Sequence, residues 1–89
     1  MVRQLKRPPS YQVIMLNDDV TPMEFVLHIL TAIFHHGTTE AAALTMQVHE
    51  KGSAICGVYT RDIAETKVEQ VLGVAREAGH PLMCMTQRE

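Results

Sequence analysis

A corner at residues 17–24 constrains this fold most, because the pattern of apolar residues changes there from that of a strand to that of a helix. Before the corner, Tyr11–Leu16 is a continuous, partly β-branched run that predicts a strand covered on both faces, at or near the centre of its sheet. The corner itself contains Asn17-Asp18-Asp19, one amide and two carboxylates. Hydrogen-bond acceptors are thus collected in a loop held by two regular elements, where binding groups are commonly mounted.

A helix is predicted to begin directly after the acidic residues. Thr21 is placed to cap it, Pro22 suits the first helical position, and Glu24 can close a capping box. The apolar residues that follow recur at the spacing of one helical face: Met23, Val26, Leu27, Leu30, Ile33 and Phe34. This face is expected to pack on the preceding strand, and His35-His36-Gly37 is expected to end the helix.

The middle of the chain predicts a second helix and a second strand. Thr38 or Thr39 can cap the helix, which Gly52 ends. Four of its residues are expected to lie on one helical face: Ala41, Leu44, Thr45 and Val48. Ser53–Tyr59 predicts the strand, with a bulge or a close approach of the backbone at Cys56-Gly57.

A third helix and a short last strand complete the pattern. Asp62 can cap the helix, which Gly79 ends. Leu82–Thr86 predicts the strand, followed by the charged end Gln87-Arg88-Glu89. The order strand-helix-helix-strand-helix-strand predicts an α+β fold with the helices on one side of a small sheet.

The chain is expected to form one domain. Its 89 residues are too few for two cores, and 46% of them are hydrophobic, too many for a disordered chain. Residues 1–9 are expected to be a flexible extension and residues 10–89 the folded core domain. Cys56 and Cys84 stand in apolar runs without C-x-x-C spacing, which predicts two reduced, packed thiols.

Charge and hydropathy argue against several classes of partner. A formal net charge of -2 provides no field for phosphate backbones or anionic lipids, so neither nucleic acid nor a membrane is an expected partner. Arg3, Lys6 and Arg7 are interpreted as a solvated start of the chain. No apolar run reaches the roughly 18 residues needed to span a bilayer, and the N-terminus lacks the apolar core of a signal peptide. We therefore expect a cytoplasmic protein.

Enzymatic chemistry is not indicated by the motifs. No Ser, Cys or Thr stands in a nucleophile motif beside a candidate base. The five histidines and two cysteines lack the close spacing of a zinc site. Neither catalysis nor a metal or other cofactor is therefore expected.

Two interpretations of residues 17–19 remain open on spacing alone. Acids ahead of a helix stabilise its dipole in any protein. Asn17, Asp18 and Asp19, however, offer more acceptors than the helix start requires, and the surplus can hold an ammonium group. His49 is likewise open to two interpretations, as a structural histidine or as one at the rim of an apolar surface.

Several blocks of this sequence together resemble the ClpS family. In chain order they are Pro8-Pro9-Ser10, Asn17-Asp18-Asp19-x-Thr21-Pro22-Met23-Glu24-Phe25-Val26, Val48-His49, Gly52-x-Ala54-Ile55-Cys56-Gly57-Val58, Ala64-Glu65-Thr66-Lys67-Val68 and His80-Pro81-Leu82. The resemblance runs in unbroken order from about Pro8 to Cys84. It implies a three-stranded antiparallel sheet packed by three helices, in agreement with the predicted order of elements.

The resemblance also implies a function, that of an adaptor in the N-degron pathway. Such an adaptor binds proteins that begin with a bulky hydrophobic residue (Leu, Phe, Tyr or Trp) and hands them to the N-terminal domain of the AAA+ unfoldase ClpA. By resemblance, the substrate's amine and first peptide units are bound by Asn17, Asp18, Asp19 and His49. The side-chain pocket is walled by Thr21, Met23, Val26, Thr45, Val48 and Leu82. The unfoldase-binding residues are Asp62, Glu65 and Lys67.

Two pocket positions carry expectations about specificity. Met23 is expected to act as a gate that accepts side chains unbranched at Cβ and crowds branched ones. Thr45 stands where relatives commonly carry Met, which predicts an altered ranking of Leu, Phe, Tyr and Trp rather than loss of binding. The alternative function is that of an interaction domain of a ribosome-associated protein, with a stalk-protein-like fold, and it rests on fold analogy alone.

Overall fold

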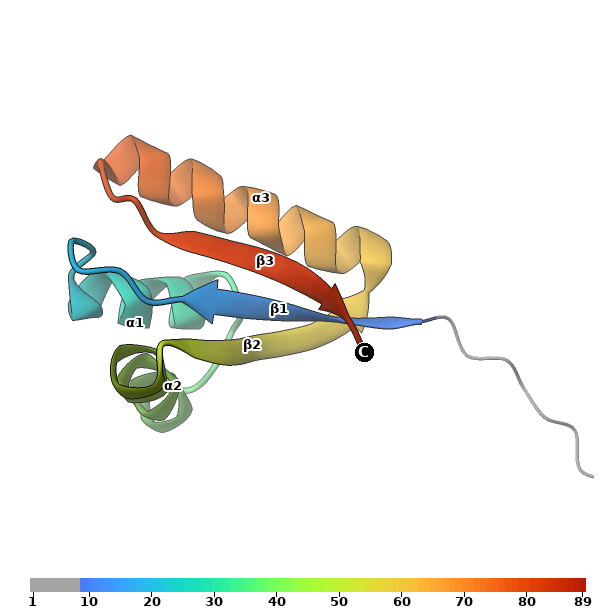
Figure 1. Ribbon diagram of the computed structural model, residues 1–89, viewed down its shortest axis with the longest axis horizontal. Coiled ribbons are helices and arrows are strands. Elements are labelled where there is room, and N and C mark those ends of the chain that lie inside the picture. Colours follow the sequence, from blue (N-terminus) through green and yellow to red (C-terminus); the bar gives the residue numbers. More distant parts are fainter. Residues whose placement is uncertain (1–8) are drawn as a thin grey trace, which may run out of the picture.

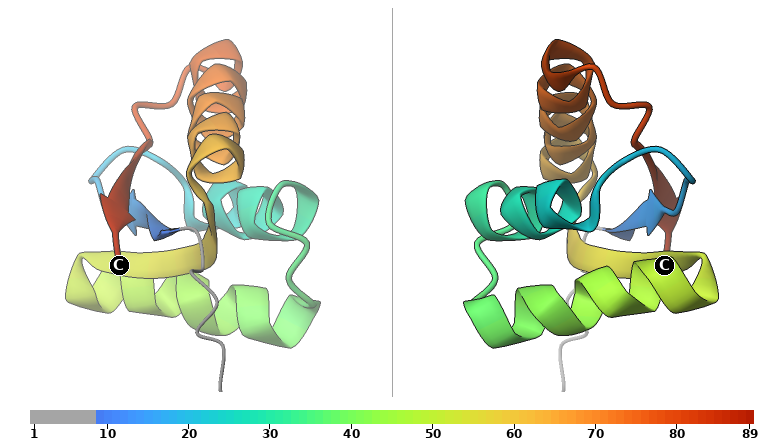
Figure 2. Two further views of the ribbon diagram at one scale, coloured as in Figure 1. Left: turned by 90° about the vertical axis from the view of Figure 1, so that its right-hand side faces the viewer. Right: turned by 90° about the vertical axis from the view of Figure 1, so that its left-hand side faces the viewer.

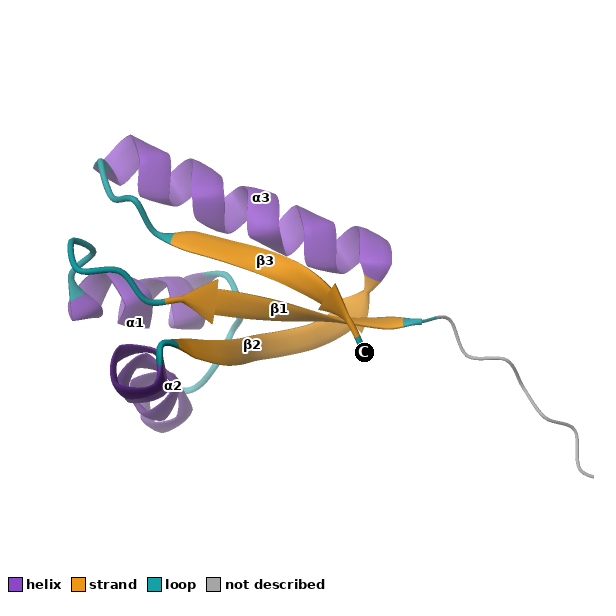
Figure 3. Cartoon of the chain, viewed as in Figure 1, coloured by secondary structure: helices purple, strands orange, loops and turns teal. Residues whose placement is uncertain are grey.

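The computed structural model describes residues 9–89 and confirms the predicted order of elements. Strand β1 (Ser10–Leu16) is followed by helices α1 (Met23–Ala32) and α2 (Thr38–Lys51). Strand β2 (Ser53–Thr60), helix α3 (Arg61–Ala78) and strand β3 (Met83–Arg88) complete the fold (Figure 1 and Figure 3). The predicted α+β class is confirmed. Of the expected flexible extension, residues 1–8 lie outside the described part.

The sheet is antiparallel throughout, with the strand order β2-β1-β3. The first strand of the chain is therefore the central one, as predicted. Leu16, its last residue, pairs with Ser53 on one side and Met83 on the other. The corner that follows thus emerges from the middle of the sheet, between the starts of both neighbouring strands.

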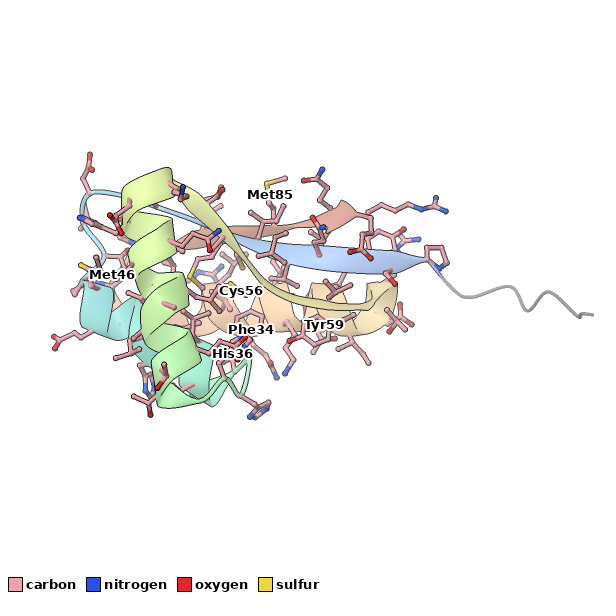
Figure 4. All side chains as sticks on the ribbon, turned by 90° about the horizontal axis from the view of Figure 1, so that it is seen from below. Phe34, His36, Met46, Cys56, Tyr59 and Met85 are labelled. Atoms are coloured by element: carbon pink, nitrogen blue, oxygen red, sulfur yellow. The ribbon has the colours of Figure 1, made fainter. Side chains whose placement is uncertain are left out.

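The two faces of the sheet differ in their cover, and the prediction that β1 is covered on both faces is wrong. Val13 and Met15 are fully buried on the inner face. On the outer face Ile14 pairs with Ile55 and Met85, which are 45% and 47% exposed. The reason is the placement of the helices: α1 and α3 lie on the same side of β1 and β3 (Figure 2), and Met85 projects to the other side (Figure 4).

The three helix starts differ from their predicted capping. Each helix begins after a residue in extended conformation, namely Pro22, Gly37 and Thr60. Within residues 9–89 none of these three residues caps its helix through a side-chain hydrogen bond. The predicted caps Thr21, Thr38 or Thr39, and Asp62 are therefore wrong, as is the capping box with Glu24. The Thr21 hydroxyl donates to Asp18 Oδ2 at 2.7 Å, which turns this side chain toward the corner.

The helix ends follow prediction more closely. Gly52 ends α2 in the left-handed conformation with φ 91°, which favours glycine, and Gly79 ends α3. Helix α1 ends at Ala32, before the predicted Ile33 and Phe34. His36 fixes the segment that follows, since its Nε2 lies 2.6 Å from the Cys56 carbonyl oxygen of β2.

Strand β2 contains the predicted irregularity. Its register against β1 shifts between Val13 and Ile14, which pair with Gly57 and Ile55, so Cys56 is the extra residue of a bulge. The predicted close approach also occurs, at Gly57, because a Cβ atom there would lie 2.7 Å from Tyr59 Cε2. Strand β3 differs from prediction at both ends: it begins at Met83 and runs to Arg88, which pairs with Tyr11.

The core is built from aliphatic and sulfur-containing side chains packed between the sheet and the helices. Met15, Ile29 and Leu30 are fully buried within it. Cys56 and Cys84 are buried free thiols, as predicted. Burial raises the pKa of Cys56 to about 12, with a contribution from Cys84, and that of Cys84 to about 11. Both thiols therefore stay protonated and unreactive at neutral pH.

Candidate functional site

A hollow of about 210 Å³ lies where the β1–α1 corner meets α2. The corner and α1 contribute most of its lining, and the second half of α2 closes the other side. The lining residues are Asn17, Asp18, Asp19, Thr21, Met23, Val26, Thr45, Val48 and His49. The structure thus brings together every residue expected to bind the amine or to wall the side-chain pocket, apart from Leu82.

Asp18 organises the corner through three hydrogen bonds. Its Oδ1 accepts from the backbone N–H groups of Val20 at 2.8 Å and Thr21 at 2.6 Å. Its Oδ2 accepts from the Thr21 hydroxyl at 2.7 Å. The carboxylate therefore fixes the turn that leads into α1, and Oδ2, which accepts only one of the three bonds, still has a lone-pair direction for a further donor.

The same contacts keep Asp18 ionised. Partial burial on its own would raise the pKa of this carboxyl group. The hydrogen bonds from Thr21 and Val20, with the charge of His80, outweigh burial and hold the pKa below its ordinary value of 3.8. Asp18 is consequently an anion at neutral pH, where an α-amino group is mostly a cation.

The corner is tied directly to the end of α2. The Asn17 backbone N–H donates to the Gly52 carbonyl at 2.9 Å. Gly52 follows the last turn of α2, which carries His49. Asn17, Asp19 and His49 are exposed and line the same hollow, so acceptors of the corner share this cavity with a histidine from a different element.

The other part of the lining is apolar. Val26 and Val48 are almost completely buried, and Met23 is 40% exposed. Thr45 is buried at 6% exposure, and its hydroxyl donates to the Ala41 carbonyl of the preceding turn at 2.8 Å. With that donor used within its own helix, Thr45 presents a small wall to the hollow. One cavity therefore combines anionic and polar acceptors with an apolar recess.

Leu82, which the resemblance assigns to the side-chain pocket, is not among the residues that line this cavity. Its side chain is 2% exposed in the core and borders a separate hollow beside Leu72 of α3. Leu82 directly precedes Met83, the first residue of β3. Its neighbour His80 does reach the site region, because its ring packs edge-on against Phe25, with 4.5 Å between centroids.

Comparison with known proteins decides the family. The model of the family described as ATP-dependent Clp protease adaptor protein ClpS matches residues 6–85. The chain belongs to the ClpS family. Members of this family are adaptors of the Clp protease, so the function class is that of an adaptor protein.

Individual ClpS relatives are similar over most of their length. The ATP-dependent Clp protease adapter protein ClpS of Paraburkholderia xenovorans is 52% identical over 85 residues, covering 96% of this chain and 82% of the relative. The ATP-dependent Clp protease adapter protein ClpS of Leptothrix cholodnii is 53% identical, and the match covers 92% of this chain and 74% of the relative. The structure of Agrobacterium tumefaciens ClpS2 bound to L-phenylalaninamide has a TM-score of 0.90 and 44% identity, and covers 93% of this chain and all of that one.

The three residues assigned to unfoldase binding by resemblance to ClpS lie on α3 but differ in surroundings. Asp62 and Glu65 are exposed, and Glu65 forms a 3.6 Å ion pair with Arg61. Lys67 is half-buried, and its ammonium donates to the Ile33 carbonyl at 2.6 Å and lies 5.8 Å from the centre of the Tyr59 ring. The Lys67 ammonium therefore supports the end of α1.

Two further observations bear on the site of this ClpS-family chain. No group of three His, Cys, Asp or Glu side chains placed to hold a metal ion occurs in the described part of the chain. None of its described helices combines the length and apolar character of a membrane span.

Proposed function

We propose that this ClpS-family adaptor binds the free N-terminus of proteins that begin with Leu, Phe, Tyr or Trp and delivers them to the unfoldase ClpA. The observation that carries this proposal is the cavity in which acceptors lie next to an apolar recess. The relative from Agrobacterium tumefaciens, with 44% identity, is named as bound to L-phenylalaninamide, a molecule with an α-amino group and an aromatic side chain.

In this proposal the polar part of the cavity holds the substrate's α-amino group. Near neutral pH that group is an ammonium with three donors. Asn17, Asp18 and His49 accept them directly or through water, and Asp19 orients the first peptide units. Asp18 suits this role because it is already ionised and fixed by Thr21 and Val20. Each hydrogen bond to a charged group contributes roughly 1.5 to 3 kcal/mol.

The apolar part receives the first side chain of the substrate. Burying a Leu or Phe side chain contributes roughly 1.5 to 3 kcal/mol. Immobilising the peptide costs about 4 kcal/mol or more, which exceeds the contribution of the side chain alone, so useful affinity requires both the amine contacts and side-chain burial. The proposal thus explains why one cavity would recognise a chain terminus and its residue together.

A panel of peptides that differ in the first residue tests this proposal. Free-amine peptides starting with Leu or Phe are expected to bind, and the same peptide starting with Gly is expected to bind roughly ten to a hundred times more weakly, because it buries no side chain. Fluorescence anisotropy measures the dissociation constants. Equal affinity for Leu and Gly peptides would contradict the proposal.

Met23 is the proposed gate of the side-chain pocket. Its flexible thioether, 40% exposed at the start of α1, would crowd side chains branched at Cβ. Met23→Ala is expected to raise the affinity for Ile and Val peptides relative to Leu by about fivefold or more. Met85→Ala, which removes a similarly exposed Met on the outer sheet face, serves as the control. An unchanged Ile-to-Leu ratio in Met23→Ala would show that Met23 is not a gate.

Delivery is proposed to use the exposed acids of α3. Asp62 and Glu65 offer carboxylates to a complementary surface on the N-terminal domain of ClpA. Lys67 is proposed to help mainly by supporting this surface, because its ammonium already binds the Ile33 carbonyl. This arrangement would leave the peptide-binding cavity and the unfoldase-binding surface on different elements.

Charge reversal on α3 separates these two surfaces. Asp62→Lys is expected to weaken binding of the ClpA N-terminal domain by about fivefold or more and to leave peptide affinity unchanged. Glu69→Lys makes the same charge change further along α3 and is the matched control. Isothermal titration calorimetry with the ClpA domain gives the affinities. Equal losses in both variants would mean that overall charge, and not Asp62, governs the contact.

A further inference from the structure

A second hollow of about 210 Å³ lies between α1 and α2, next to the proposed side-chain pocket. Its lining comes equally from the two helices: Met23, Glu24, Leu27, Ala42, Thr45 and Met46. Met23 and Thr45 also line the hollow at the corner. These two side chains therefore stand between the hollows as a partition.

The partition consists of one movable and one short side chain. Met23 is unbranched and 40% exposed, so it can change rotamer at little cost. Thr45 is buried and held by its hydrogen bond to the Ala41 carbonyl, and its side chain is shorter than that of Met23. When Met23 moves aside, only a short side chain separates the two spaces.

The second hollow suits an apolar group. Leu27, Ala42 and Met46 supply aliphatic and thioether surface, and Met46 is 44% exposed although it is apolar. Glu24 is the one charged residue in its lining, and it is exposed. An aromatic ring that enters from the corner would meet apolar surface on both helices.

We infer that the two hollows are two chambers of one side-chain site, and that the second chamber takes the outer part of N-terminal side chains larger than phenylalanine. The inference rests on the proposed function, and it names tryptophan as the natural residue that gains most. We assign the outer part of the substrate's first side chain to the second chamber because this chamber adjoins the first and shares Met23 and Thr45 with it. A leucine side chain ends in the first chamber and does not use the second.

The test fills the second chamber without touching the first. Ala42 is exposed on α2 and lines only the second of the two hollows, so Ala42→Leu reduces that space and keeps a strong helix former at this position. The neighbouring Ala43, exposed and outside both linings, gives the matched control Ala43→Leu. The probes are peptides identical except for a first residue of Leu, Trp or 4-phenylphenylalanine.

The expected result is selective. Ala42→Leu should weaken binding of the Trp and 4-phenylphenylalanine peptides by about fivefold or more and change the Leu peptide less than twofold. Ala43→Leu should change none of them. Thr45→Met, which thickens the partition, should lower the Trp-to-Leu affinity ratio in the same direction.

Three outcomes would overturn the inference. Unchanged Trp affinity in both Ala42→Leu and Thr45→Met would mean that the second hollow is not used. Equal weakening of Leu and Trp peptides by Ala42→Leu would indicate a general disturbance of α2. If the unsubstituted chain binds Leu and Trp peptides only as weakly as a Gly peptide, the proposed function itself fails, which the first two outcomes leave intact.

Discussion

Acetylation of the peptide's N-terminus is expected to weaken its binding by about a hundredfold or more. An acetyl group removes the positive charge and two of the three donors that Asn17, Asp18 and His49 are proposed to accept. Loss of two charged hydrogen bonds at the lower end of their range, roughly 1.5 kcal/mol each, corresponds to this factor. Fluorescence anisotropy with a Leu-starting peptide, free or acetylated, measures it. Tight binding that survives acetylation would contradict amine recognition.

A double-mutant cycle assigns this effect to the corner. In Asp18→Ala the free peptide should bind weakly and acetylation should matter much less, because the ionised acceptor is gone. Asp18→Asn is the second variant, since it keeps acceptor capacity at Oδ1 for Thr21 and Val20 while removing the charge. If acetylation were equally damaging in all three proteins, Asp18 would be a structural residue of the corner and not an amine ligand.

Ile29→Ala is expected to lower the free energy of unfolding by about 2 to 5 kcal/mol. Ile29 is fully buried at the centre of α1, and truncation leaves a cavity that the neighbouring helices and sheet fill only in part. Small domains are stable by about 5 to 15 kcal/mol, so this change removes a large share. Urea denaturation followed by circular dichroism measures the loss.

Two controls make the Ile29 result specific. Ile29→Val removes one methyl group and should cost only about 0.5 to 1.5 kcal/mol. Ile63→Ala truncates an isoleucine that is 50% exposed on α3 and should have a small effect. Because Ile29 lies outside the lining of the cavity, the folded fraction of Ile29→Ala should retain peptide affinity at low temperature. A loss below about 1 kcal/mol would show that the core readjusts around the site.

The periodic parts of the fold could be predicted from the sequence because their information is local. The run from Tyr11 to Leu16 identified the central strand, and the Gly52 break identified the end of α2. Helix starts could not be predicted equally well, since several residues compete for the same hydrogen bonds. Threonine is a common capping residue, but the hydroxyl and the backbone N–H of Thr21 both donate to the carboxylate of Asp18, three residues earlier. Which acceptor prevails depends on the three-dimensional turn.

Contacts between residues far apart in the sequence limited how much of the site could be predicted. The sequence resemblance placed Asn17, Asp18 and His49 in one site, and the cavity at the corner brings them together. The surroundings of the Lys67 and Leu82 side chains depend on how elements distant in the sequence pack together. Lys67 reaches the end of α1, 34 positions away, and Leu82 turns into the core, and neither contact leaves a periodic signal in the sequence.

The place of β1 in the sheet has a mechanical consequence. The corner continues directly from the last residue of β1, which is hydrogen-bonded to neighbours on both sides. If a substrate binds at Asn17–Asp19 as proposed, a tensile load on it would be passed into a strand that is hydrogen-bonded on both sides, whereas a load on β2 or β3 would act on a strand held by one ladder. Pulling the site out of the sheet would therefore require both ladders to break.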